Sequence, residues 1–155
     1  MKRLTISRTG FLAALVLSVL AFAIAPAGAG EKPMKFKAQL IWGTNDDSSP
    51  NPDHKPIDPK LAKKLEKMPI KWKNYFQVTE KEFTVAKNAT TKLQMSTELS
   101  ITVRHVDAEN VEVELFGKGK SIGKVTKSLG TGKSLLTGGD AKNYTAWFVF
   151  IKQVD

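Results

Sequence analysis

The sequence contains no cysteine. This absence excludes a disulfide framework, thiol catalysis and thiolate metal sites. It also excludes a lipid anchor of the bacterial type, because such an anchor is attached to a cysteine just after an N-terminal export signal. The stability of the folded chain therefore has to come from side-chain packing.

Arginine is almost absent after position 29, where every basic residue except Arg104 is lysine. Specific phosphate recognition favours the planar guanidinium, which makes two parallel hydrogen bonds. Lysine used in this way is typical of a solvated surface, so we do not expect a nucleic-acid partner. The net charge is +9 for the whole chain and +6 once the three basic residues of the first 29 positions are left out.

Histidine occurs only twice, as His54 in a proline-rich segment and His105 at the end of an expected strand. A Ser-His-Asp triad needs a nucleophile and a carboxylate beside one of them, and no Gly-x-Ser-x-Gly motif is present. We therefore predict no catalytic residue, and we predict no cofactor.

The first 29 residues have the pattern of a cleavable export signal. Lys2, Arg3 and Arg8 supply a positive start, residues 11–25 form an uncharged apolar core, and Ala27, Gly28 and Ala29 form a signal-peptidase pattern, all in that order along the chain. The core is shorter than the roughly 20 residues that cross a membrane as a helix. These features predict a periplasmic or secreted protein without a transmembrane helix after cleavage. An uncleaved, membrane-tethered form is the alternative.

Residues 30–155 are expected to form a single β-rich domain, because a chain of this length supports one apolar core. Residues 34–42 alternate apolar and polar side chains, which predicts a half-buried strand. Residues 43–58 are rich in Asn, Asp, Ser and Pro and predict an exposed loop, or an extended segment laid over the domain. Asp58 and Pro59 then start a short helix over 59–68.

Several strands are expected after Pro69. Ile70, Trp72 and Phe76 lie on one face of one candidate strand, and residues 83–85 form another short piece. Residues 101–106 and 111–116 predict an antiparallel hairpin.

The inward residues of this hairpin restrict its register, because a slip of one residue would turn one strand inside out. One permitted register places Arg104 opposite Glu112 and Thr102 opposite Glu114. Residues 117–120 form the next turn, which brings Leu115 opposite Ile122.

The C-terminal third contains two further glycine-rich turns, at residues 127–133 and 138–140. The last strand, residues 144–151, is apolar on both faces from Ala146 onward, so we expect it in the middle of a sheet or under a second layer. With seven to nine short strands and one helix, the chain is predicted to be all-β, a single antiparallel β-sandwich or partly closed barrel.

Three local patterns invite a chemical interpretation. Residues 130–134 resemble the end of a phosphate-binding loop. That motif requires glycine at position 127, where this chain has lysine, so a glycine-rich turn is the better interpretation of these residues. Glu112 and Glu114 are the outward face of a strand rather than a glycosidase pair. An oxygen-rich loop lacks the ligand alternation of a calcium loop and is better explained by turns and a helix cap; it comprises Asn45, Asp46, Asp47, Asp53 and Asp58.

Charge is distributed unevenly along the chain. Residues 55–73 carry +5, residues 98–114 carry −4, and residues 118–133 carry +5. Either the lysines form a surface for a negatively charged partner, or the acidic strand neutralises them.

Trp72, between Lys71 and Lys73, is expected to pack in the core. The candidate partner-binding residues are Lys63, Lys64, Lys67, Lys71, Lys73, Lys118, Lys120, Lys124 and Lys127.

Three hypotheses about function follow. The first is an exported, non-enzymatic β-domain that acts by surface contact in the cell envelope, on a protein, on an anionic polymer or in an assembly. The second is an exported hydrolase whose carboxylates come from distant parts of the chain. The third is a structural subunit that exchanges strands with its neighbours, which the apolar segment 146–151 suggests.

Overall fold

The computed structural model describes residues 32–154, so the predicted export signal lies outside the described residues. Within that range the chain forms two antiparallel sheets and one short helix, and the sheets do not close into a barrel. The predicted β-sandwich is therefore confirmed. Among residues 32–154 there is no helix with the length and hydrophobicity that a membrane span requires.

The five-stranded sheet has the order β2-β3-β1-β9-β8, and the four-stranded sheet has the order β4-β5-β6-β7. Along the chain the elements are β1 (Met34–Thr44), β2 (Lys55–Pro56), α1 (Pro59–Glu66), β3 (Asn74–Val85), β4 (Thr90–Gln94), β5 (Leu99–Asp107), β6 (Asn110–Gly117), β7 (Lys120–Ser128), β8 (Ser134–Asp140) and β9 (Ala146–Gln153).

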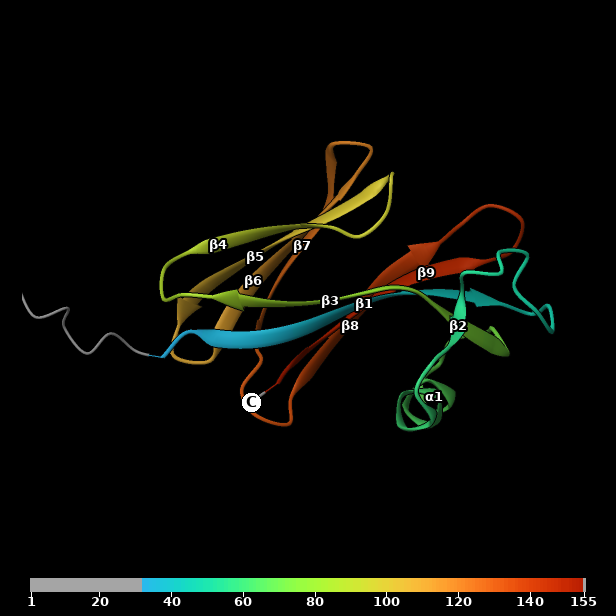
Figure 1. Cartoon of the computed structure of the whole chain (residues 1–155), viewed down its shortest axis with the longest axis horizontal. Coiled ribbons are helices and arrows are strands. Elements are labelled where there is room, and N and C mark those ends of the chain that lie inside the picture. Colours follow the sequence, from blue (N-terminus) through green and yellow to red (C-terminus); the bar gives the residue numbers. More distant parts are fainter. Residues whose placement is uncertain (1–31, 155) are drawn as a thin grey trace, which may run out of the picture.

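The five-stranded sheet is the middle layer of the molecule, with the four-stranded sheet on one face and α1 on the other (Figure 1). The alternation of side chains in β1 explains how the two sheets pack together. Phe36, Ala38 and Leu40 point to one face and are buried in the core between the sheets. Lys35, Lys37 and Gln39 occupy the intervening positions and therefore lie on the face that α1 partly covers.

The α1 helix starts where its sequence predicts. The Asp58 carboxylate caps it by accepting hydrogen bonds from the backbone amides of Lys60 at 2.9 Å and Leu61 at 3.2 Å. Leu61 and Leu65 are buried in a second apolar cluster that holds the helix against the sheet. The helix ends at Glu66, two residues before the predicted end.

The apolar strand β9 lies between β1 and β8. Val149 and Ile151 are buried between the sheets, whereas Phe148 and Phe150 are buried in the cluster under α1. The prediction of a central strand is confirmed, and β9 is covered on both faces as well. This position accounts for the apolar segment that suggested strand exchange.

The hairpin of β5 and β6 has the predicted register. Arg104 pairs with Glu112 and Thr102 pairs with Glu114. The guanidinium Nε of Arg104 lies 3.3 Å from Glu112 Oε1 on the outward face of this sheet.

Three predictions about the strands are wrong. β3 is one strand of 12 residues that begins at Asn74, so Ile70 and Trp72 precede it. Leu115 pairs with Gly123 instead of Ile122, because a bulge places an extra residue in β7. Residues 138–140 belong to β8 instead of a turn, since Gly138 approaches the β9 backbone too closely for any larger residue.

The segment 43–58 contains more regular structure than a loop alone. β1 continues through Thr44, and the two-residue strand β2 pairs with β3. Between them the Asn51 side chain accepts a hydrogen bond from the Asp53 amide, and Thr44 Oγ1 accepts one from the Asp46 amide. The polar residues here stabilise tight turns.

Candidate functional site

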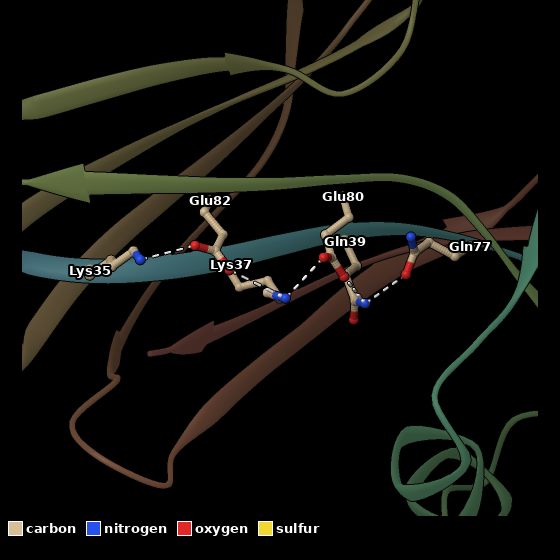
Figure 2. Close-up of polar contacts among 6 residues, drawn as sticks. All are labelled: Lys35, Lys37, Gln39, Gln77, Glu80 and Glu82. Carbon is tan, nitrogen blue, oxygen red and sulfur yellow. Dashed lines mark hydrogen bonds and ion pairs between the residues drawn. The ribbon is translucent and has the colours of Figure 1, made fainter. Parts of the chain in front are cut away.

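The face of β1 and β3 nearest α1 has a ladder of polar side chains, shown in Figure 2. Lys35 Nζ lies 3.0 Å from Glu82 Oε2. Lys37 Nζ lies 2.9 Å from Glu80 Oε1 and 3.4 Å from Glu82 Oε1. The alternation that buries the other face of β1 therefore places both lysines beside carboxylates of the neighbouring strand.

Gln39 continues the ladder and is 7% exposed. Its amide nitrogen donates to Glu80 Oε2 at 2.7 Å and to Gln77 Oε1 at 2.8 Å. Both carboxylate oxygens of Glu80 are thus engaged, one by Lys37 and one by Gln39. The ladder is a connected network, which holds these side chains in defined positions.

The charges of this network stabilise one another. The hydrogen bond from Lys37, followed by that from Gln39, lowers the pKa of Glu80, although partial burial opposes the shift. The same bond from Lys37 to Glu80 raises the pKa of Lys37. Both groups therefore remain ionised at neutral pH.

Replacing Glu80 with glutamine is expected to lower the free energy of unfolding by about 1 kcal/mol at pH 7. Because folding lowers the pKa of Glu80 below its ordinary value of 4.5, its contribution is present above that value and is lost as the pH falls through the folded-state value. Urea unfolding at pH 7 and pH 3 should show the difference between wild type and Glu80→Gln shrinking at low pH.

Glu66→Gln is the matched control, since Glu66 is exposed on α1 and makes no ion pair within residues 32–154. We expect it to change stability little at either pH. A difference for Glu80→Gln that stayed the same at pH 7 and pH 3 would contradict the assigned role of its charge.

A cavity of about 330 Å³ lies between α1 and the ladder. Leu61 and Phe150 form apolar parts of its wall, and two carboxylate residues, Asp58 and Glu80, also line it. Four of its lining residues are lysines from three elements; they are Lys37 of β1, Lys60 and Lys64 of α1, and Lys152 of β9.

Two of the lysines of this cleft lie on neighbouring strands. Lys37 and Lys152 are directly paired across β1 and β9, and like charges in such positions destabilise a sheet slightly. Lys64 Nζ donates to Ser134 Oγ, and Ser134 is itself the β8 neighbour of Lys152. Lys60 and Lys152 make no ion pair with any residue from 32 to 154. The cleft therefore holds uncompensated positive charge.

The carboxylates of the cleft do not form an acid and base pair. Asp58 caps α1 through Oδ1, and Glu80 is held by Lys37 and Gln39. A general acid of a glycosidase needs a raised pKa, whereas the pKa of Glu80 is lowered. This geometry suits the binding of a negatively charged group rather than proton transfer.

Neither histidine lines the cleft. His54 Nδ1 lies 2.7 Å from Ser49 Oγ. His105 is 2% exposed, and its Nε2 donates to the carbonyl of Ala108 at 2.8 Å. His105 is thus a packed residue of the sandwich.

The lysines that were predicted to bind a partner lie on two separate layers of the molecule. One group lies on α1 or between α1 and β3, and the other lies on the turn before β7 and on β7, at the edge of the four-stranded sheet. The first group is Lys63, Lys64, Lys67, Lys71 and Lys73; the second is Lys118, Lys120, Lys124 and Lys127.

The second group lies beside the acidic strand β6. Lys124 Nζ is 3.6 Å from Glu112 and 3.4 Å from Glu114, and Lys118 Nζ is 3.5 Å from Glu98. These distances favour the interpretation in which opposite charges neutralise one another on this sheet. Lys120 and Lys127 make no ion pair within residues 32–154.

Lys60 and Lys152 are site residues that were not predicted from the sequence, and the same holds for the ladder beside them. One signal was available: in β1, Lys35, Lys37 and Gln39 alternate with buried residues and therefore share a face. Their meeting with Lys152 depends on which strand pairs with β1, and the sequence pattern does not specify that pairing.

The other candidate motifs have structural roles. The glycine-rich residues 130–133 belong to the connection between β7 and β8, and Ser134 is the first residue of β8. Asn45 Oδ1 accepts a hydrogen bond from the Lys73 amide at 3.1 Å. No cluster of three or more His, Asp or Glu side chains with metal-binding geometry occurs in the described part of the chain.

Comparisons with models of protein families, with curated proteins and with solved structures find no match to this chain. The geometry of its own residues is therefore the basis for a functional proposal.

Proposed function

We propose that this chain is an exported, non-enzymatic binding domain that holds negatively charged groups of a cell-envelope partner in the cleft under α1. One observation carries the proposal: Lys152 lies opposite Lys37, and neither Lys152 nor Lys60 has a carboxylate partner within residues 32–154. An anionic group entering the cleft would supply the counter-charge that Lys60 and Lys152 lack.

The walls of the cleft favour such a group. Leu61 and Phe150 are buried apolar side chains, and low-dielectric walls strengthen the field of nearby charges. Gln77 also lines the cleft, whereas the amide nitrogen of Gln39 already donates to Glu80 and Gln77. A carboxylate, sulfate or phosphate group has the charge that this arrangement accepts.

The exposed face of α1 extends the positive surface beyond the cleft. Lys63 and Lys67 are exposed and make no ion pair among the described residues, and Lys73 follows before β3. A long anionic partner, either an acidic protein segment or an anionic polymer, would contact these lysines after one of its charges entered the cleft. The predicted export signal would bring the domain to the compartment where envelope polymers occur.

The test is a binding titration of the exported form with two anionic probes, poly-L-glutamate for a protein partner and polyphosphate for a polymer. Replacing both Lys60 and Lys152 with alanine is expected to weaken binding about tenfold, since each lysine contributes roughly 0.5 to 1 kcal/mol. Binding should also weaken as salt is raised. The probe that binds more tightly identifies the kind of partner.

The matched control is the double variant Lys120→Ala and Lys127→Ala. It removes the same charge from β7, where neither lysine has an ion pair within residues 32–154. We expect binding within twofold of wild type. Equal losses in the two double variants would contradict a defined site, and so would an absence of binding to both probes at low salt.

A further inference from the structure

The turn between β8 and β9 has an unusual residue in a strained position. Asn143 and Tyr144 both have positive φ, at 59° and 56°, and the Thr145 amide donates to the Lys142 carbonyl at 3.3 Å. Two central residues of this kind make a type I′ turn, which favours Asn followed by Gly. Tyr144 therefore occupies a position where glycine is preferred.

Tyr144 gains no burial from this position. Its exposed fraction is 92%, the highest of the large hydrophobic residues in the described range. A bulky side chain in the left-handed region is disfavoured by its own backbone. The turn between β6 and β7 follows the usual rule, with Gly119 as its second central residue at φ 79°. A tyrosine that holds a strained backbone conformation and is 92% exposed points to a role other than stability.

A cavity of about 360 Å³ lies beside Tyr144. Trp72 forms one wall, and its ring nitrogen donates to the Tyr144 carbonyl at 2.9 Å. The Trp72 ring is held edge-on against Phe148, with centroids 5.7 Å apart. The ring is thus fixed to the sheet on one side and to the strained turn on the other.

Polar groups surround the two aromatic residues. Lys71 Nζ lies 5.0 Å from the centroid of the Trp72 ring and 3.7 Å from Asp140 Oδ1, and both residues line the cavity with Asn143. Lys71 and Asp140 carry opposite charges and pair with each other, whereas Lys60 and Lys152 of the cleft under α1 have no carboxylate partner among residues 32–154. The site therefore offers hydrogen-bond donors and acceptors with little net charge.

We propose that this turn is a binding site for a neutral sugar ring of a glycan. The C–H face of a pyranose is apolar and packs on an aromatic ring, while its hydroxyls need both donors and acceptors around the edge. Tyr144 and Trp72 supply the rings, and Asp140, Asn143 and Lys71 supply the polar edge. The near balance of charge favours an uncharged sugar over an anion.

The test is retardation of the full exported protein in native gels that contain laminarin, galactomannan or dextran. We expect retardation by at least one of them. Tyr144→Gly should weaken this binding about tenfold or more, because it removes the exposed ring. The same variant should raise the melting temperature by about 4 °C, because glycine relieves the backbone strain. Loss of binding in a stabilised protein cannot be attributed to unfolding.

Ile122→Ala is the control, because Ile122 is 51% exposed on β7 and lies outside this cavity. It should bind as wild type does, and the Lys60 and Lys152 double variant should also keep glycan binding, which separates this site from the cleft under α1. The proposal is overturned if none of the three polysaccharides retards the protein, or if Tyr144→Gly is retarded as strongly as wild type. Loss of retardation in Ile122→Ala to the same degree would overturn it as well.

Discussion

Replacing Gly138 with alanine is expected to destabilise the domain by about 3 kcal/mol. A Cβ atom at this position would lie 2.2 Å from the backbone oxygen of Trp147 and 2.9 Å from the Cα of Phe148. Both contacts are with backbone of β9, the strand that pairs with β8, so no side-chain rotation relieves them. The edge strand would have to move away from the sheet.

Gly139→Ala is the matched control in the next position of the same strand. The nearest atoms to its added Cβ belong to the Trp147 ring, at 3.6 Å or more, which is an ordinary contact distance. Thermal unfolding should show a melting temperature about 10 °C lower for Gly138→Ala and within about 3 °C of wild type for Gly139→Ala. Similar losses in both variants would contradict the close packing of β8 on β9.

Replacing Phe36 with alanine is expected to cost about 3 to 5 kcal/mol of stability. Phe36 is fully buried between the two sheets and is stacked on Phe83, with ring centroids 5.6 Å apart. The substitution removes a large apolar side chain and leaves a cavity that strands on both sides prevent from closing. Urea unfolding of the purified variant measures the loss.

The neighbouring residue Lys35 provides the comparison for Phe36. It belongs to the same strand but lies on the opposite face, where its partly exposed side chain pairs with Glu82 at 3.0 Å. Lys35→Ala should change stability by less than about 1 kcal/mol. Equal effects at positions 35 and 36 would mean that the alternation of β1 does not separate a core face from a polar face.

Much of the fold can be predicted from the sequence, because the relevant forces act over a few residues. Alternation predicts β1, the Asp58 and Pro59 pair predicts the start of α1, and the requirement for a shared apolar face restricts the register of Arg104 against Glu112. Two of the three wrong strand predictions involve contacts across strands. Gly138 is the clearest case, because a glycine needed for close backbone approach resembles a glycine needed for a turn.

The candidate site could be predicted only in part. Lysine-rich segments are visible in the sequence, and α1 does carry several of these lysines. The neutralisation of Lys124 by Glu112 and Glu114 depends on the pairing of β6 with β7. The pairing of the strands therefore decides which lysines lack a counter-charge. The lysine-rich segments of the sequence do not decide it.

The sequence by itself determined that this domain is a cysteine-free, lysine-rich β-structure with one capped helix, since composition and periodicity decide those features locally. Only the tertiary structure decided that β9 separates β1 from β8, which puts Lys152 opposite Lys37 beneath α1. It also decided that Trp72 meets the strained Tyr144 turn across 72 positions of the chain. These juxtapositions come from strand order, which depends on the packing of two whole sheets rather than on any local pattern.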